Sequence, residues 1–177
     1  KRRIAREAPS AAPPAPRPSV ARLSPYVPGE QPFDPRTIKL NTNEFPYPAA
    51  PEVIDAIRRE TGDRVRVYPN PTAEPLRRRL AERHGVEPSQ ILVGNGSDEI
   101  LRLLVQAYGG PGRPMAVVDP TYSLYPVLAT QFETPLETHP LDAQTALPES
   151  LFASEAGLCL LAHPNPPVPS ILRGSRS

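Results

Sequence analysis

Short apolar runs alternate with segments of helical period along most of this chain, and this alternation limits its fold more than any other feature. The runs at 115–118 and 158–162 are typical of strands, whereas Val53, Ile54 and Ile57 share one face of a helix that begins at Pro51. Strand, helix and strand in that order form a right-handed crossover in a parallel sheet. The sequence therefore predicts an α/β fold with a mostly parallel sheet, in which ligands bind at the carboxyl ends of the strands.

The remaining expected elements continue this alternation. Capping residues and glycines mark the ends of two of the helices. The elements are a helix capped by Thr72 and followed by Gly85, a short buried strand at 91–93, a helix capped by Ser97 and ended by Gly109, a helix over 122–131 and a strand over 135–138.

Prolines, 27 in the whole chain, are most frequent in the N-terminal segment and the C-terminal tail. The N-terminal segment is also rich in Ala, Arg and Ser, and such a composition buries too little apolar surface to offset the entropy lost on ordering. We expect a flexible Pro/Ala-rich arm over residues 1–35 and one partial domain over 36–167. Residues 168–177 are expected to be unstructured, and they read like out-of-frame sequence.

The formal net charge of +1 gives no overall field that would favour nucleic acid or an anionic membrane as a partner. The chain has no run of about 18 apolar residues, and its N-terminus lacks the apolar centre of a signal peptide. Cys159, the single cysteine, lies in the apolar run 158–162 and is expected to be a small buried side chain. These features predict a soluble, cytoplasmic protein.

The segment Gly94-Asn95-Gly96-Ser97 follows an expected strand and opens an expected helix. Free N–H groups at a helix start, with the positive end of the helix dipole, can bind a phosphate. The segment lacks the third glycine of a dinucleotide fingerprint and the Gly-Lys-Ser/Thr of a P-loop. Taken alone it fits a capped helix after a glycine turn better than a binding site, and Asp98 and Glu99 would stabilise a helix start in any protein.

Tyr122 and Tyr125 follow the strand at 115–118, which places their rings at the same sheet edge as the glycine turn. A flat ring there could stack on a planar cofactor. One of the two tyrosines is expected to be a core residue with a polar tip. His163 follows the strand at 158–162 without a visible metal partner or nucleophile, so no catalytic role and no metal site are predicted.

Five short motifs occur along the chain in a fixed order. They are Leu23-Ser24-Pro25-Tyr26, Leu40-Asn41-Thr42-Asn43-Glu44, Tyr68-Pro69, Gly94-Asn95-Gly96-Ser97-Asp98-Glu99 and Pro120-Thr121-Tyr122-Ser123-Leu124-Tyr125. In this order they resemble histidinol-phosphate aminotransferase, a dimeric fold-type-I enzyme that uses pyridoxal 5'-phosphate (PLP). The resemblance covers about Ser24 to Pro167 and implies a truncated large domain of that fold.

The resemblance implies transfer of an amino group between glutamate and imidazole-acetol phosphate, a step of histidine biosynthesis, by a homodimer. PLP would act as the electron sink, and the protein would hold and tune it. The implied binding residues are Gly96, Ser97 and Asp98 at the PLP phosphate, Tyr122 over the pyridine ring, Tyr68 at the PLP phosphate of a second subunit, and Tyr26 and Asn43 at the substrate.

The chain departs from the family pattern after Ala162. The family's Pro-Asn-Asn-Pro-Thr-Gly segment appears here as Pro164-Asn165-Pro166-Pro167, so Asn165 is the local substitute for the Asn that contacts the PLP ring oxygen. Transamination also needs an amine to hold PLP and move the α-proton. The only lysines, Lys1 and Lys39, lie in the arm and before a family motif. No catalytic residue is therefore assigned, and the chain is expected to be inactive alone.

Three alternatives remain open at this stage. A threonine-phosphate decarboxylase-like protein of the same superfamily shares the N-terminal motifs. A non-catalytic fragment that binds phosphate or PLP would need only the glycine turn and the aromatic ring. A chain that does not fold is the third, since a truncated sheet leaves exposed edges.

Overall fold

The computed structural model describes residues 15–24, 30–34, 36–41, 44–142 and 146–166. The chain divides into two compact units. Unit 1 takes in the chain up to Ser24 and from Asn95 onward, and unit 2 is Pro25–Gly94. The expected boundaries of the arm, of the domain over 36–167 and of the tail remain predictions.

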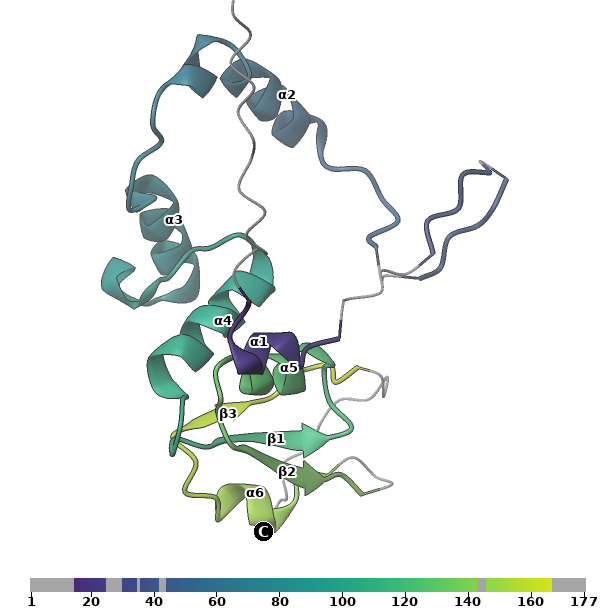
Figure 1. The fold of residues 1–177 in the computed structure, drawn as a ribbon. Helices are drawn as coiled ribbons and strands as arrows, with labels where there is room; N and C mark the ends of the chain where they lie inside the picture. The colour runs from purple at the N-terminus through teal and green to yellow at the C-terminus, as the bar shows by residue number, and fades with distance from the viewer. Residues whose placement is uncertain (1–14, 25–29, 35, 42–43, 143–145, 167–177) are drawn as a thin grey trace, which may run out of the picture. The chain divides into compact units, whose positions relative to one another are not determined.

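Unit 1 is built, in its described residues, on a three-stranded parallel sheet in the order β2-β1-β3 (Figure 1). Strand β1 is Met115–Asp119, β2 is Leu136–Pro140 and β3 is Leu158–Leu160. The prediction of a parallel α/β sheet is confirmed. Three of the four expected strands are present, with their ends shifted by no more than two residues.

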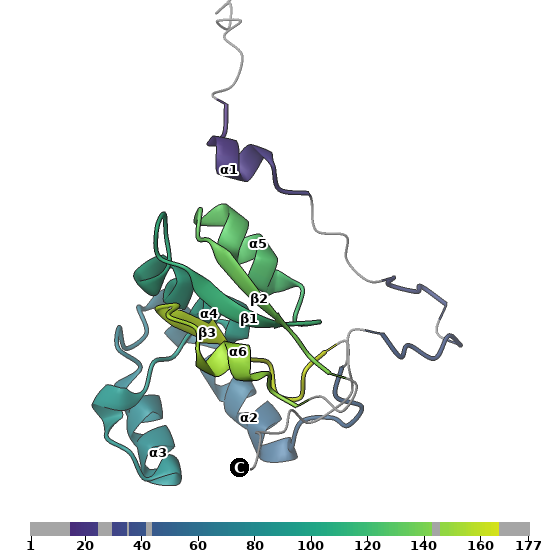
Figure 2. The ribbon, with the colours of Figure 1, turned by 90° about the horizontal axis from the view of Figure 1, so that it is seen from below.

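Helices cover both faces of this sheet (Figure 2). Helices α4 (Gly96–Tyr108) and α5 (Leu124–Gln131) pack on one face, and α6 (Glu149–Phe152) packs on the other. Successive strand residues point to opposite faces, so Met115 and Val117 join the first core, and Ala116 and Val118 the second. Burial on both faces explains why β1 is a continuous apolar run instead of an alternating one.

Gly109 ends α4, as expected, and the surrounding packing requires a glycine there. A Cβ at Gly109 would lie 2.6 Å from Thr134 Oγ1 and 2.8 Å from the carbonyl oxygen of Val105. Thr134 Oγ1 also accepts a 2.8 Å hydrogen bond from the backbone N–H of Gly110. The threonine is therefore held in place and cannot move aside without losing that bond.

Replacing Gly109 with Ala is expected to lower the free energy of unfolding by about 1–3 kcal/mol, because an added methyl group must displace packed atoms. Gly62→Ala is the matched control, since no heavy atom lies within 4 Å of its Cβ position. Urea denaturation of the two variants measures the difference. Equal unfolding midpoints would contradict the clash.

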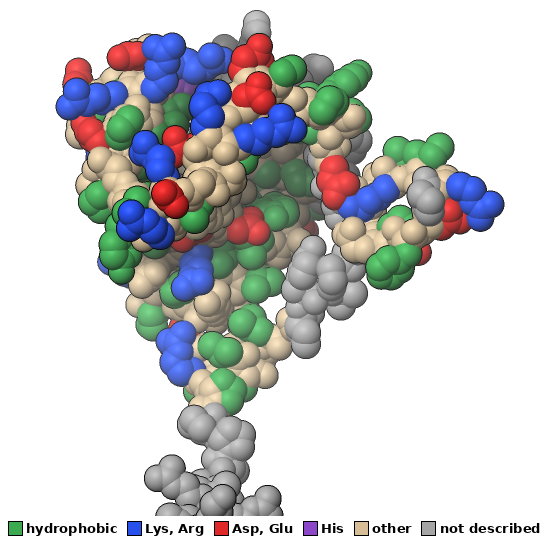
Figure 3. Space-filling view, turned by 90° about the horizontal axis from the view of Figure 1, so that it is seen from above, with side chains coloured by type: hydrophobic (Ala, Val, Ile, Leu, Met, Phe, Trp, Pro, Cys, Tyr) green, Lys and Arg blue, Asp and Glu red, His purple; other side chains and the backbone are tan. Residues whose placement is uncertain are grey.

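Unit 2 contains α2 (Pro51–Glu60), η1 (Asp63–Arg66), α3 (Glu74–His84) and η2 (Pro88–Gln90). The expected start of α2 at Pro51 is confirmed. Ala81 is the single buried hydrophobic residue among the described residues of this unit. Figure 3 shows hydrophobic side chains on the surface among acidic and basic ones, with charges of both signs intermixed.

The predicted cap of α3 by Thr72 is wrong, although the expected left-handed Gly85 after its end is confirmed. Asn70 Oδ1 accepts hydrogen bonds from the backbone N–H groups of Thr72 and Glu74, both at 3.1 Å. It also accepts a hydrogen bond from the hydroxyl group of Thr72. An asparagine that bonds the backbone two residues ahead forms an Asx turn, and here that turn supplies the oxygen expected from Thr72.

The predicted buried strand at 91–93 is also wrong. These residues pair with no strand in the described part of the chain, and Leu92 is exposed. The backbone of Ile91 is engaged locally, because its N–H donates to the carbonyl oxygen of Pro88 and its own carbonyl accepts from Arg77 Nε at 3.0 Å. An apolar run becomes a strand only where a partner strand takes up its hydrogen bonds.

Helix α1 (Pro18–Ala21) was not expected, since it lies within the segment interpreted as an arm. It packs against α5, and Ser19 is fully buried. Arg17 Nη2 donates to the carbonyl oxygen of Gln131 at 3.4 Å. None of the described helices combines the length and the apolar character needed to cross a membrane.

The prediction that Cys159 is buried is wrong, since its side chain is exposed. Among the described residues β3 is an edge strand, and β1 lies on only one side of it. The neighbouring protein atoms still remove part of the surrounding water, and this desolvation raises the pKa of the Cys159 thiol. The exposed thiol therefore stays protonated over a wider pH range than a free cysteine.

Alkylation of Cys159 by iodoacetamide is expected to be slower in the folded chain than in the urea-unfolded chain near the ordinary thiol pKa of about 8.5, because the thiolate is the nucleophile. The folded state holds this proton more tightly. The contribution of the Cys159 thiol to folding stability is thus complete below the thiol pKa of the unfolded chain, and it is lost as pH rises through the thiol pKa of the folded chain. Identical pH–rate profiles for the two states would contradict the raised pKa.

Candidate functional site

Helix α4 begins at Gly96, whose φ of 78° lies in the left-handed region that favours glycine. The prediction that Ser97 caps this helix is wrong, because Ser97 lies inside the first turn and Asn95 is the capping residue. Asn95 makes no side-chain cap, and its backbone N–H donates to Glu99 Oε2 at 2.5 Å. Asp98 and Glu99 do occupy the first turn, as expected.

The first turn of α4 has the chemistry of an anion site. The first N–H groups of a helix have no partner within the helix, and the dipole adds positive potential there. The two acids of this turn oppose an anion, but both accept hydrogen bonds from the protein: Glu99 from Asn95, and Asp98 Oδ1 from the Tyr122 hydroxyl at 3.3 Å. Their orientation toward these donors leaves the backbone N–H groups as the donors for a ligand.

One of the two tyrosines, Tyr125, is a core residue, as expected. Tyr125 belongs to α5 and is buried in the core, and desolvation raises the pKa of its phenol. Tyr122 is half-buried just before α5 and meets Tyr125 edge to face, with 5.7 Å between ring centroids. Both rings line the same open pocket, and the Tyr122 hydroxyl donates a hydrogen bond to Asp98 on α4.

An open pocket of about 630 Å³ brings Ser97, in the first turn of α4, and the ring of Tyr122 together within unit 1. Its size lies in the range of small-molecule sites, roughly 300–1,000 Å³. Helix α4 supplies Ser97, the turn before α5 supplies Tyr122, and the segment after β3 supplies His163 and Pro166. These segments follow the carboxyl ends of β1 and β3 or begin a helix, where the fold predicts ligand binding.

Asn165 lies beside this pocket but does not line it. Its side chain is fully buried, and Nδ2 donates to the carbonyl oxygen of Pro120 at 2.8 Å. Its Oδ1 is buried without a hydrogen-bond partner in the described residues. His163 is exposed at the pocket wall, and no group of three or more His, Cys, Asp or Glu in the described part of the chain could hold a metal ion.

The other predicted site residues lie outside the described part of unit 1. Tyr26 and Asn43 lie outside the described residues. Tyr68 belongs to unit 2, where its side chain is fully exposed. Lys39, also in unit 2, forms an ion pair with Glu44.

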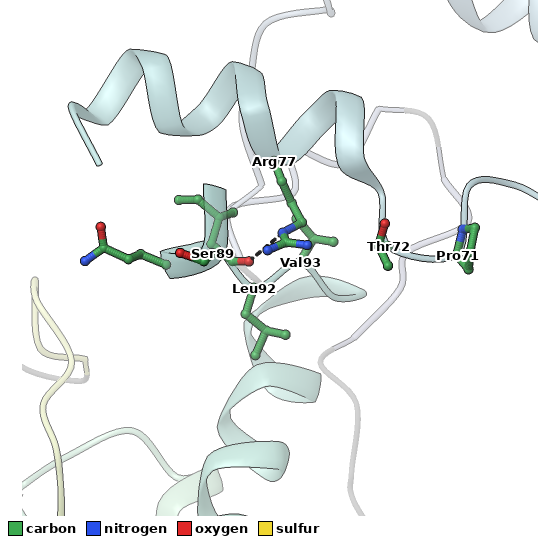
Figure 4. Close-up of a pocket in the computed structure, with 8 residues that line it drawn as sticks. Pro71, Thr72, Arg77, Ser89, Leu92 and Val93 are labelled. Atoms are coloured by element: carbon green, nitrogen blue, oxygen red, sulfur yellow. Dashed lines mark hydrogen bonds between the residues drawn. The ribbon is translucent and has the colours of Figure 1, made fainter. Parts of the chain in front are cut away.

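Sequence reasoning missed a second pocket, of about 460 Å³, within unit 2 (Figure 4). The side chain of Arg77 enters it from α3, and Arg77 Nη2 donates to the carbonyl oxygen of Pro88 at 2.6 Å. Nε donates to the carbonyl oxygen of Ile91. Because its donors meet backbone carbonyls, Arg77 joins α3 to the η2 segment, and no sequence motif marks such a bond.

The chain belongs to the aminotransferase class I and II family, whose pattern it matches over residues 35–150. Within this family it is similar to histidinol-phosphate aminotransferases. It is 45% identical to histidinol-phosphate aminotransferase 2 of Burkholderia mallei over 151 residues, 84% of this chain and 42% of that protein. It is 43% identical to the Synechocystis enzyme over 85% of this chain and 43% of that protein. The chain thus spans less than half the length of these curated relatives.

Solved structures show the same fold. Histidinol-phosphate aminotransferase from Sinorhizobium meliloti, solved in complex with pyridoxal-5'-phosphate, matches with a TM-score of 0.60 and 27% identity, over 67% of this chain and 33% of that one. L-threonine-O-3-phosphate decarboxylase from Porphyromonas gingivalis matches with a TM-score of 0.52 and 24% identity, over 66% and 34%. The second likeness supports the fold-type-I assignment and carries no argument about activity.

Proposed function

We propose that this chain provides the PLP-phosphate and ring-binding part of an aminotransferase that transfers an amino group from glutamate to imidazole-acetol phosphate, giving histidinol phosphate and 2-oxoglutarate. The single observation that carries the proposal is the pocket that joins Ser97 at the start of α4 to the ring of Tyr122. Identity of 45% to a histidinol-phosphate aminotransferase supports the choice of substrate.

The residues of the pocket fit PLP in two respects. Ser97 lines the pocket at a helix start, where its backbone N–H and those of the adjacent Gly96 and Asp98 suit a phosphate, and the ring of Tyr122 suits a flat pyridine. The buried, unpartnered Oδ1 of Asn165 is a polar atom beside the same pocket. Contact of Asn165 with the cofactor ring remains a prediction, since its Nδ2 is already engaged by Pro120.

When bound, PLP supplies an electron sink for carbanion chemistry at the amino-acid α-carbon. The chain's own residues contribute binding and orientation. Ser97 and its neighbours would hold the phosphate, Tyr122 would cover one ring face, and Asp98 would fix the Tyr122 hydroxyl. No lysine lines the pocket among the described residues, so the set present here accounts for cofactor binding and not for proton transfer.

Changing Ser97 to Glu is expected to weaken PLP binding by about tenfold or more, because a carboxylate would lie next to the phosphate and repel it. Gln106→Glu adds the same charge to the last turn of α4, away from the pocket, and serves as the control. Equilibrium dialysis with PLP measures both dissociation constants. Equal losses for the two variants would contradict a phosphate site at Ser97.

Assembly belongs to the same proposal. The family resemblance implies a homodimer in which Tyr68 reaches the PLP phosphate of a second subunit, and the fully exposed ring of Tyr68 is available for such a contact. Sedimentation of the chain with and without PLP tests the assembly. Contacts of Tyr26 and Asn43 with substrate, and a cytoplasmic location, remain predictions.

A further inference from the structure

We infer that Asn165 is a positioning residue, which acts on the pocket by holding the turn that carries Tyr122. The inference rests on the proposed function of the pocket but concerns a different bond from any contact with cofactor. It depends on three observations: the burial of Asn165, the atom to which its amide donates, and the pocket residues that lie close in sequence to each end of this hydrogen bond.

Burial shows that Asn165 is part of the packed structure. It is fully buried, and it is among the largest fully buried side chains of the described residues. A buried amide costs free energy unless its donors find acceptors, so the hydrogen bond that the Asn165 amide donates offsets part of the cost of its burial.

The acceptor is the carbonyl oxygen of Pro120, at 2.8 Å and 45 residues away in sequence. The last residues paired between β1 and β3 are Val117 and Leu160, which precede Pro120 and Asn165 in sequence. Beyond the end of this ladder, the Asn165 side chain joins the segment after β3 to the turn after β1.

This turn carries the aromatic ring of the pocket. Tyr122 follows Pro120 by two residues, packs edge to face on Tyr125 and donates to Asp98. On the other side, Pro164 and Pro166, the neighbours of Asn165 in sequence, both line the pocket. One buried hydrogen bond thus fixes two walls of the same pocket relative to each other.

A direct contact between Asn165 and a bound ligand is the competing role. That role would use Oδ1, which has no partner in the described residues. Positioning uses Nδ2. Asn165→Asp keeps an oxygen at the Oδ1 position and loses the donor, whereas Asn165→Ala loses both, so the two variants separate the roles.

The test combines a double-mutant cycle in PLP affinity with ring NMR of the full chain. Positioning predicts that Asn165→Ala and Asn165→Asp each weaken PLP binding by about tenfold, the scale of one lost buried hydrogen bond. It also predicts that adding either to Tyr122→Ala causes no further loss, because residues that act through one another are not additive. Multiplicative losses, or native affinity in Asn165→Asp, would overturn the inference.

The ring signals of Tyr122 decide the question even when the native chain binds no PLP, a result that would overturn the proposed function alone. Positioning predicts that both variants shift the Tyr122 ring resonances while β1 amide signals stay native. Unchanged ring resonances would refute it. If both variants unfold at neutral pH, Asn165→Asp is examined at acid pH, where a protonated carboxyl can donate a hydrogen bond to the carbonyl oxygen of Pro120. A native Tyr122 ring signal at that pH supports positioning. A chain that remains unfolded, or a shifted Tyr122 ring signal, contradicts it.

Discussion

Met115→Ala is expected to lower the free energy of unfolding by about 2–5 kcal/mol, a large share of the roughly 5–15 kcal/mol typical of a folded domain. Met115 is fully buried at the start of the central strand, between α4 and α5 and beside both neighbouring strands. Truncation there removes apolar contacts and leaves a cavity that the sheet cannot close.

Leu103→Ala is the control, because Leu103 lies on α4 with 42% of its surface exposed. Its loss is expected to stay below about 1 kcal/mol. Chemical denaturation of both variants, followed by far-ultraviolet circular dichroism, gives the comparison. A Met115→Ala variant as stable as Leu103→Ala would mean that the sheet of unit 1 is not the core of the folded chain.

The 177-residue chain with added PLP is expected to show no glutamate-dependent turnover with imidazole-acetol phosphate. Transamination requires an amine at the cofactor, and the pocket has no lysine among its described residues. The chain's two lysines are Lys1 and Lys39, and Lys39 is paired with Glu44.

The assay needs an active reference, for which a full-length histidinol-phosphate aminotransferase at the same PLP concentration is suitable. Formation of 2-oxoglutarate is the measured quantity. We expect the chain to bind PLP without turnover. Turnover that persists after the chain has been repurified would contradict the claim that it lacks the amine needed for transamination.

The parallel sheet was predictable because its central strand is apolar on every buried position, a pattern that a strand covered on both faces requires. The segment 91–93 is also an apolar run, but it has no partner strand among the described residues, so its apolar character alone was misleading. The prediction that Cys159 is buried was wrong for a related reason, since burial of a strand residue depends on what lies beside the strand.

The site was predictable where chemistry is local to a motif. Gly96 and Tyr122 were selected from short segments, and one pocket contains the neighbouring Ser97 together with Tyr122. The buried hydrogen bond from Asn165 to Pro120 joins residues 45 apart and leaves no pattern in the sequence. The Asx turn of Asn70 was missed because Thr72 is also a residue type that accepts hydrogen bonds from the backbone before a helix, and only the backbone geometry chooses between them.

The most direct test of the central claim is a titration of the isotopically labelled chain with PLP, followed by backbone and ring NMR. The account predicts saturable shifts concentrated at Gly96, Ser97, Asp98 and the ring of Tyr122. Absence of saturable shifts, or shifts centred instead on the Arg77 pocket of unit 2, would contradict the claim that the start of α4 and Tyr122 form the cofactor site.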